Sequence, residues 1–145
     1  MNVEILGRKS AVKSAIHHCI LFFIKELKLQ NSRYNLIVVT DRGMASRDGY
    51  RGAVLKLGPK EIAMQIDTAL DTEKLIVTLA HEMVHVKQYA KGQITHGKNV
   101  KSKYWMGRPI KADYFDTPWE IEAYSKERIL ANKIFATFKK KRKKK

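Results

Sequence analysis

The spacing of apolar residues in the first half of the chain predicts one helix followed by three strands. Apolar residues recur every three or four positions over residues 10–29, which is the spacing of one helix face. Residues 35–40 form a short, β-branched apolar run that predicts a buried strand. Residues 51–57 predict a second strand, and residues 61–67 alternate between apolar and polar side chains and predict a third. A turn is expected over residues 47–50.

The second half of the chain predicts two further helices joined by an irregular segment. Asp71 can cap a helix that continues through residues 75–90, and Gly92 is placed to end it. Residues 93–116 are polar, basic and aromatic, and we expect an ordered irregular segment there with a short hairpin. The last helix should span residues 117–138. These elements predict an α+β fold with an N-terminal helix, a small three-stranded sheet, a central helix and a C-terminal helix.

The central helix contains the pentapeptide His81-Glu82-Met83-Val84-His85, which has the pattern H-E-x-x-H. Residues four apart on a helix lie one above the other, so His81 and His85 can direct two imidazoles at one point. Glu82 stands next to them and can reach a water molecule held at that point. This arrangement is that of a catalytic zinc ion with its general base, and it predicts a zinc site.

The same pentapeptide could instead be a surface feature, with two exposed histidines and a solvated carboxylate. The surrounding helix argues against this alternative, because it is apolar on nearly every side. Its apolar residues are Ile76, Val77, Leu79, Ala80, Met83, Val84 and Val86. A helix of this kind is usually buried, and buried imidazole and carboxylate groups need partners.

Composition places the chain among globular, intracellular proteins. With 145 residues, of which 44% are hydrophobic, the chain can form one domain with its own core. No apolar run is long enough for a membrane span, and no signal-peptide pattern is present. The single cysteine, Cys19, has no partner for an internal disulfide. We therefore expect an intracellular, cytoplasmic protein.

The net charge of the chain is +15, and a large part of it lies at the C-terminus. Residues 139–145 are all Lys or Arg and supply seven of the 29 basic residues. A run of like charges cannot pack into a core, so we expect a domain over residues 1–138 followed by a disordered polybasic tail. The tail could bind nucleic acid non-specifically through phosphate contacts, or it could serve only solubility.

A catalytic zinc ion needs a third protein ligand, and three residues downstream of the pentapeptide are candidates. Glu120 and Glu122 begin the last helix and point about 200° apart on it, so the two are not expected to serve together. His96 lies beyond the expected end of the central helix and could fold back. Glu120 also has a purely structural interpretation, because Thr117-x-x-Glu120 has the pattern of a capping box.

The pentapeptide and the segment Pro118-Trp119-Glu120-Ile121-Glu122-Ala123-Tyr124 together resemble the gluzincin group of zinc metallopeptidases. In that group the third ligand is a Glu in an E-x-x-A pattern on a downstream helix, so the resemblance implies that Glu120 is the ligand. Tyr124 stands where many members have an Asp that hydrogen-bonds a ligand histidine. Asp113, Asp116 or a backbone carbonyl could orient the imidazoles instead.

Over about residues 70–130 the chain is also similar to small zincin-like proteins that are common in bacteriophage genomes. This resemblance implies a zincin-like fold with the pentapeptide on its active-site helix, a Zn²⁺ cofactor and a peptide or protein substrate. For a phage protein it implies the cytoplasm of the host cell. The SprT-like proteases, which act near nucleic acid, share H-E-x-x-H and small size. Their third ligand is typically a histidine, so His96 would have to serve.

These residues predict a zinc-dependent metallopeptidase. Its zinc-activated water attacks a peptide carbonyl, and Glu82 is the general base that passes the proton to the leaving amine. A tyrosine could donate a hydrogen bond to the oxyanion, and the candidates are Tyr104, Tyr114 and Tyr124. The strand at residues 61–67 precedes the active-site helix. The likeness to zincins makes it the candidate edge strand for pairing with an extended substrate.

Two other classes of function stay open at this point. The first is a basic nucleic-acid-associated protein in which the pentapeptide is incidental or holds a structural metal. The chain has no helix-turn-helix signal, zinc-finger cysteine pair or RNP-like aromatic pattern that would support it. Salt-sensitive DNA binding without bound zinc, retained after removal of the tail, would favour it. The second is a pseudo-enzyme that binds the metal without turnover.

Overall fold

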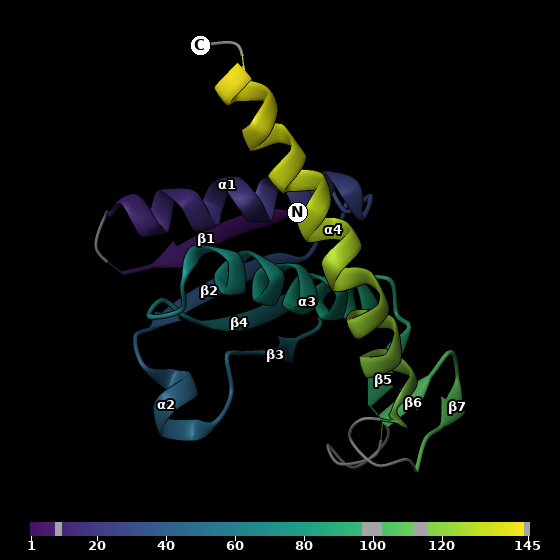
Figure 1. The fold of residues 1–145 in the computed structure, drawn as a ribbon. Coiled ribbons are helices and arrows are strands. Elements are labelled where there is room, and N and C mark those ends of the chain that lie inside the picture. The colour runs from purple at the N-terminus through teal and green to yellow at the C-terminus, as the bar shows by residue number, and fades with distance from the viewer. Residues whose placement is uncertain (8–9, 97–102, 112–115, 144–145) are drawn as a thin grey trace.

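The computed structural model describes residues 1–7, 10–96, 103–111 and 116–143, with side chains described as far as residue 140. It has the α+β architecture shown in Figure 1, which confirms the class predicted from the sequence. In chain order, the elements are β1 (Asn2–Leu6), α1 (Ala11–Glu26), β2 (Asn35–Asp41), α2 (Met44–Asp48), β3 (Gly52–Gly58), β4 (Glu61–Asp67), α3 (Thr72–Ala90), β5 (Ile94–His96), β6 (Lys103–Trp105), β7 (Arg108–Pro109) and α4 (Pro118–Lys143).

The first four strands form one mixed sheet with the order β1-β2-β4-β3. β1, β2 and β4 are parallel, whereas β3 is antiparallel to β4 and lies at the edge. One face of the sheet is apolar: Val38 of β2 pairs with Ile5 and Met64, and all three side chains are buried. An apolar sheet face must be covered by another layer, and here that layer is helical.

The prediction of a three-stranded sheet is wrong by one strand, because β1 was not expected. β1 is short, and only Val3 and Ile5 of its residues share the apolar inner face, as their pairing with Leu36 and Val38 shows. An alternation of this length is a weak signal, and the segment becomes a strand by hydrogen bonding to β2. The three strands that were predicted correspond to β2, β3 and β4.

α1 and α3 cover the apolar face of the sheet, and α4 crosses over them (Figure 1). The sheet and the three helices share one core. α3 is buried on nearly every side because it lies between the sheet and α4, which explains its nearly continuous apolar pattern. Among the described helices, none is long and apolar enough to cross a membrane.

The ends of α3 lie where the sequence predicts them. The side chain of Asp71 accepts a hydrogen bond from the backbone N–H of Lys74 at 2.9 Å, so it caps the helix. Gly92 follows the last turn with a φ of +70°, a left-handed conformation that favours glycine. These two signals determine where α3 begins and where it ends, and the two histidines lie between them.

Three other segments differ from the prediction. Residues 44–48 form the short helix α2, which overlaps the expected turn at residues 47–50. β5, β6 and β7 form a small antiparallel sheet where one short hairpin was expected, so the hairpin is present and has one strand more. The predicted helix end at residue 138 is wrong, because α4 continues to Lys143 and residues 139–143 are therefore helical. Lys and Arg are good helix formers, and cations interact favourably with the C-terminal end of a helix dipole.

Candidate metal centre

His81 and His85 lie one turn apart on α3 and face the same point. Their side chains are largely buried, with 11% and 13% of their surface exposed. Their Nε2 atoms are 3.2 Å apart, and the planes of the two rings meet at 79°. The structure therefore brings the two imidazoles together as their spacing on the helix predicts.

Glu120 brings a third ligand atom to the same point from the first turn of α4. Its Oε1 atom contacts Nε2 of His85 and lies 3.5 Å from Nε2 of His81. Only 2% of Glu120 is exposed. One possible ligand atom from each of the three residues lies within 4.8 Å of the other two, so together they could hold a metal ion.

Glu122 and His96, the other two candidates for the third ligand, lie outside this cluster. Two oxygens of Glu122 accept hydrogen bonds from Nζ of Lys87 at 2.8 and 2.7 Å. Burial alone would raise the pKa of Glu122, but hydrogen bonds from Lys87 and Gln88 help to lower it to about 2. His96 lies on β5 and stacks on Tyr89, with ring centroids 6.0 Å apart.

Each histidine of the cluster is oriented by a side chain that was not predicted from the sequence. Oε1 of Glu127 lies 3.3 Å from Nδ1 of His81. Oε1 of Gln88 lies 2.8 Å from Nδ1 of His85. Partners of this kind determine which ring nitrogen of a histidine is left to bind a metal.

The spacing of residues could have indicated these two partners. Glu127 follows Glu120 by seven positions, or about two helical turns, and therefore lies on the same face of α4. Gln88 is three positions after His85 and shares its face of α3. The prediction instead considered Asp113, which lies outside the described residues, and Asp116, which makes neither contact.

The hydrogen bonds of Gln88 determine the tautomer of His85. Nε2 of Gln88 donates to the carbonyl of Trp119 and to a carboxylate oxygen of α4, both at 2.9 Å. Because both partners are acceptors, the amide carbonyl must face His85, and Nδ1 of that ring must carry the proton. The carboxylate of Glu127 has the same effect on His81. Each Nε2 atom therefore directs a lone pair at the point between the rings.

These groups fit a cation at their centre. Two lone pairs and a carboxylate oxygen meet at a buried point, which is unfavourable unless a proton or a metal ion lies between them. Burial lowers the pKa of His81, but a hydrogen bond to Glu120 and neighbouring carboxylate charges outweigh it and raise the pKa overall. Two nitrogen ligands at about 2.0–2.1 Å in a tetrahedral site lie about 3.3 Å apart. The observed separation of the Nε2 atoms is 3.2 Å.

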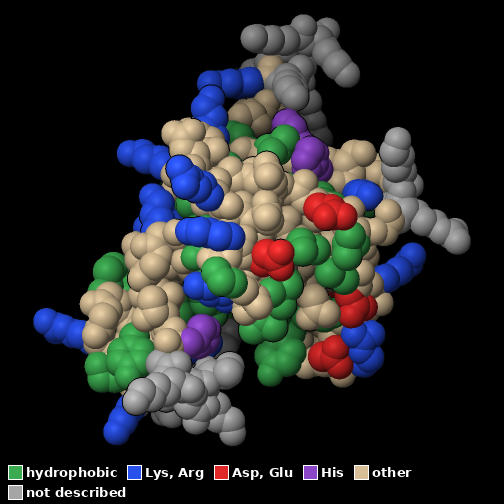
Figure 2. Space-filling view, turned by 180° about the vertical axis from the view of Figure 1, so that it is seen from behind, with side chains coloured by type: hydrophobic (Ala, Val, Ile, Leu, Met, Phe, Trp, Pro, Cys, Tyr) green, Lys and Arg blue, Asp and Glu red, His purple; other side chains and the backbone are tan. Residues whose placement is uncertain are grey.

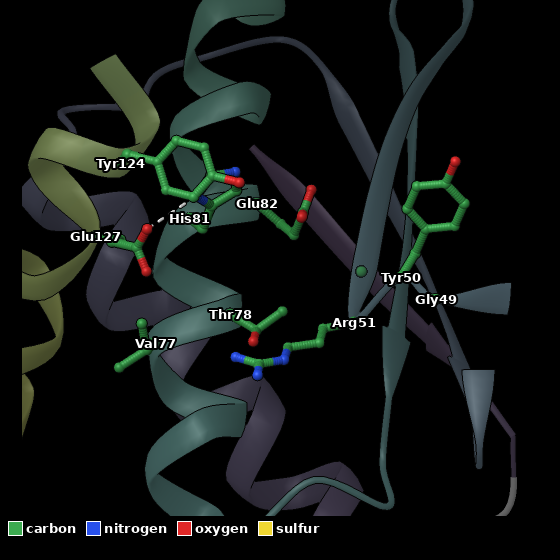
Figure 3. Close-up of a pocket in the computed structure, with 10 residues that line it drawn as sticks. Gly49, Tyr50, Arg51, Val77, Thr78, His81, Glu82, Tyr124 and Glu127 are labelled. Carbon is green, nitrogen blue, oxygen red and sulfur yellow. Dashed lines mark hydrogen bonds and ion pairs between the residues drawn. The ribbon is translucent and has the colours of Figure 1, made fainter. Parts of the chain in front are cut away.

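Glu82 stands beside the cluster, where two pockets meet. It lines a larger pocket of about 590 Å³ together with His81, and a smaller one of about 180 Å³ together with His85. Figure 3 shows the larger pocket between α3, α4 and the segment that leads into β3. Burial raises the pKa of the Glu82 carboxyl group, and only 6% of the residue is exposed. This burial makes the carboxylate a stronger base than an exposed glutamate.

Gly52, at the start of β3, leaves the space that Glu82 occupies. A Cβ atom at this position would lie 2.9 Å from Cγ of Glu82 and 3.2 Å from Cγ2 of Thr78. It would also lie 3.1 Å from the carbonyl oxygen of Gln65. A glycine is therefore needed for β3 to approach α3 this closely. The sequence offers no signal for this role, because the contact joins two separate elements.

Of the tyrosines predicted as hydrogen-bond donors, Tyr124 is the one that lies beside the cluster. Its ring centroid is 4.7 Å from that of His81, and it lines the larger pocket (Figure 3). Tyr104 lies on β6 and lines neither pocket, and Tyr114 lies outside the described residues. Tyr50 was not predicted from the sequence, yet it lines both pockets with 61% of its surface exposed.

The prediction that residues 61–67 form an edge strand is wrong. These residues form β4, which pairs with β2 on one side and with β3 on the other, so its backbone groups are already used. β3 is the edge strand on the side of the cluster, and Gly52, Ala53 and Val54 line the smaller pocket. Strand order depends on long-range pairing and cannot be read from the alternation within one strand.

Comparisons of the chain with protein-family models, with curated proteins and with solved structures find no match. The fold and the site together define an α+β protein with a candidate metal centre. The functional argument rests on three features of that centre: a buried His-His-Glu cluster, a carboxylate beside it, and two pockets that meet at this carboxylate.

Proposed function

We propose that this chain is a zinc-dependent metallopeptidase with a zincin-like fold and a gluzincin-like set of ligands. The observation that carries the proposal is the convergence of His81, His85 and Glu120 on one buried point. Glu82 beside this point and the two pockets that it lines supply what a hydrolase needs in addition, namely a base and room for substrate. The likeness of the sequence to gluzincins supports the same proposal.

Zinc is the metal that this set of donors favours. Two imidazole nitrogens and one carboxylate oxygen form the three-ligand set of many catalytic zinc sites, which leaves a fourth position for water or substrate. Mg²⁺ and Ca²⁺ favour ligand sets made of oxygen atoms. When bound, zinc would polarise a substrate carbonyl and lower the pKa of a water molecule to about 7.

Glu82 would be the general base of the reaction. Its buried carboxylate can take a proton from the attacking water and then give that proton to the leaving amine. Burial raises the pKa of Glu82, which makes the carboxylate a stronger base than an exposed glutamate and helps it to take the proton. Its place between the two pockets would put it next to the middle of a peptide that occupies both.

Tyr124 and β3 would position the substrate. The Tyr124 hydroxyl group could donate a hydrogen bond to the oxyanion that forms as the carbonyl is attacked. Backbone groups on the outer edge of β3 could pair with an extended peptide, which is a common way to bind a peptide without strict sequence selection. We assign the pairing with an extended peptide to β3 and not to β4, because β3 is the edge strand next to the cluster.

The metal content of the purified protein, measured by elemental mass spectrometry, tests the proposal first. We expect about one zinc ion per chain in the wild type and in Glu82→Gln, because Glu82 is not a ligand. His81→Ala and Glu120→Gln should lose the metal. His96→Ala is the matched control, because it removes a histidine that lies outside the cluster and should leave the zinc content unchanged.

The outcomes of this experiment separate the competing interpretations. A wild-type protein without zinc, after zinc has been supplied and the excess removed, would refute the proposal. Loss of zinc in His96→Ala but not in Glu120→Gln would favour a ligand set like that of the SprT-like group. Zinc binding without hydrolysis of a proteome-derived peptide library by the wild type would favour a pseudo-enzyme.

A further inference from the structure

Arg51 carries a cation into the larger pocket. The pocket has a volume of about 590 Å³, and Arg51 lines it together with Val77, Thr78 and Glu127. Figure 3 shows the guanidinium group reaching from the strand side of the pocket across to α3, where it lies near Thr78. His81 and Glu82 line the same pocket at its other end. A ligand in this pocket could therefore contact Arg51 and the candidate metal centre at the same time.

The backbone beneath Arg51 is held in place by Asp67. The carbonyl oxygen of Arg51 accepts a hydrogen bond from the backbone N–H of Asp67 at 2.9 Å. The carboxylate of Asp67 in turn accepts hydrogen bonds from the N–H groups of Gly43, Ala45 and Ala69, at 2.8 to 2.9 Å. These hydrogen bonds hold its pKa below the ordinary range. Asp67 is only 2% exposed, so this anchor is part of the folded core.

Arg51 has no anionic partner among the described residues. Arg47 pairs with Asp41 at 2.6 Å and with Asp48 at 3.0 Å, whereas no ion pair or hydrogen bond joins the Arg51 side chain to any described residue. Of the two carboxylates that line the pocket, Glu127 is engaged with His81. The guanidinium group is therefore available to a ligand.

We propose that Arg51 binds a carboxylate group of the substrate, which makes acidic peptides the preferred substrate class. The inference rests on the proposed peptidase function and adds a substrate class to it. A guanidinium group presents a planar pair of donors that matches the two oxygens of a carboxylate. Among the residues that line the pocket, Arg51 is the one with a permanent positive charge.

The charge balance of the pocket favours a carboxylate over a phosphate group. Glu82 and Glu127 line the same pocket, so a dianionic phosphate group bound to Arg51 would meet about twice the repulsion from these carboxylates that a singly charged group would meet. A carboxylate carries a single negative charge and meets less repulsion. The net charge of +15 would also draw acidic polypeptides toward the protein from a distance. The carboxylate could belong to an Asp or Glu side chain or to the C-terminus of a peptide.

Peptide binding without cleavage tests this inference. Fluorescence anisotropy would be measured with zinc-supplied Glu82→Gln protein, which should not cut the peptides, and with the same protein carrying Arg51→Gln in addition. The probes are short labelled alanine-based peptides with blocked ends and one Glu or one Gln placed at each position in turn. A third probe has no acidic side chain but a free C-terminal carboxylate.

We expect one position at which the Glu peptide binds about tenfold or more tightly than its Gln counterpart. Arg51→Gln should abolish this preference, and Arg51→Lys should retain part of it. Arg42→Gln is the matched control, because Arg42 lines a different pocket and its loss should leave the preference intact. If the free C-terminus and not the Glu side chain shows the Arg51-dependent gain, Arg51 binds the terminal carboxylate and the preference for acidic peptides is refuted.

Other outcomes would overturn the inference. These are equal affinity for Glu, Gln and free-terminus peptides, a preference that survives Arg51→Gln, and an absence of binding to every probe. Zinc content and peptide cleavage by the wild type are measured in parallel, so the two proposals can fail separately. Arg51-dependent binding without zinc would retain the carboxylate site and refute the peptidase. Zinc binding and peptide cleavage without a carboxylate preference would retain the peptidase proposal and refute the carboxylate site.

Discussion

Gly52 and Glu82 face each other where β3 approaches α3, at the centre of the candidate site. The side chain of Glu82 occupies the volume in which any other residue at position 52 would place its Cβ atom. Tyr50 and Arg51, which line the larger pocket, directly precede Gly52 in the chain. Because Gly52 has no side chain, the start of β3 can lie this close to the proposed general base, Glu82.

Gly52→Ala should reduce peptidase activity while zinc content stays unchanged. The added Cβ would lie 2.9 Å from Cγ of Glu82 and would displace the carboxylate from its place as the proposed general base. A displacement of about 1 Å can cost about 100-fold in rate, so we expect kcat/KM to fall by about 10- to 100-fold. Measurement of kcat/KM beside metal content and urea denaturation separates this effect from unfolding.

Gly58→Ala is the control for this substitution. Gly58 lies at the other end of β3, and a Cβ atom there would meet no atom within 4 Å. We expect its kcat/KM to stay within about twofold of the wild type, since no contact of the site changes. Equal losses in Gly52→Ala and Gly58→Ala would show that β3 as a whole, and not the contact with Glu82, limits activity.

An ion pair between Lys87 and Glu122 joins α3 and α4 next to the candidate metal centre. Only 8% of the Lys87 side chain and 20% of the Glu122 side chain are exposed. Burial lowers the pKa of Lys87, although Glu122 opposes this effect. Glu122 also accepts a hydrogen bond from Gln88, the residue that orients His85. The packing of α3 on α4 and the orientation of His85 are therefore linked through the carboxylate of Glu122.

Glu122→Gln should destabilise the protein by about 1–3 kcal/mol at pH 7, because it leaves the largely buried ammonium group of Lys87 without its anion. The pKa of Glu122 is lowered from 4.5 to about 2 in the folded chain. A lowered pKa stabilises the folded state above the unfolded value and loses that effect as the pH falls toward the folded value. The stability difference in urea denaturation should therefore be largest above pH 4.5 and shrink toward pH 2.

Glu73→Gln is the matched control, because Glu73 of α3 pairs with Arg128 of α4 at 3.0 Å on the surface. The side chains of this pair are 66% and 56% exposed, so solvent screens the interaction. Its loss should change the free energy of unfolding by less than about 0.5 kcal/mol at any pH tested. A similar effect of both variants would mean that burial does not distinguish the two pairs.

The distribution of charge over the whole molecule sets the tail apart from the site. Residues 139–145 carry seven positive charges, and without them the net charge falls from +15 to +8. Glu120 lies in the first turn of α4, whereas residues 139–143 of the tail lie at its other end (Figure 1). Figure 2 shows further Lys and Arg side chains along one side of the molecule. The basic character is therefore not confined to the tail.

Replacement of all seven tail residues by Gln should weaken non-specific DNA binding but leave zinc binding intact. Each lost phosphate contact reduces the slope of log affinity against log salt by about 0.9, so the slope should fall by up to about 6. Titrations of a DNA duplex at several salt concentrations, beside metal analysis, measure both effects. An unchanged slope would place DNA binding on the rest of the basic surface, and a loss of zinc would contradict the separation of tail and site.

The residues that could be predicted from the sequence are those whose geometry is local. His81, Glu82 and His85 lie within a little more than one helical turn, so the period of the backbone alone brings the two histidines together. The cap at Asp71 and the end at Gly92 follow from the same local rules. β2, β3 and β4 were predicted for the same reason, because strand patterns repeat over a few residues.

Only the tertiary structure could decide the rest, because it depends on contacts between distant segments. Whether β3 or β4 lies at the sheet edge is set by hydrogen bonds between strands, and no local pattern encodes their order. Glu120 was a candidate in the sequence, but the packing of α4 on α3 places its carboxylate at the histidines. The role of Glu127 depends on the same packing: its spacing from Glu120 puts it on the same face of α4, but its hydrogen bond to His81 spans 46 positions of the chain. Gln88 lies close to His85 on α3, but its amide is turned toward His85 by its hydrogen bond to the Trp119 carbonyl, 31 positions away.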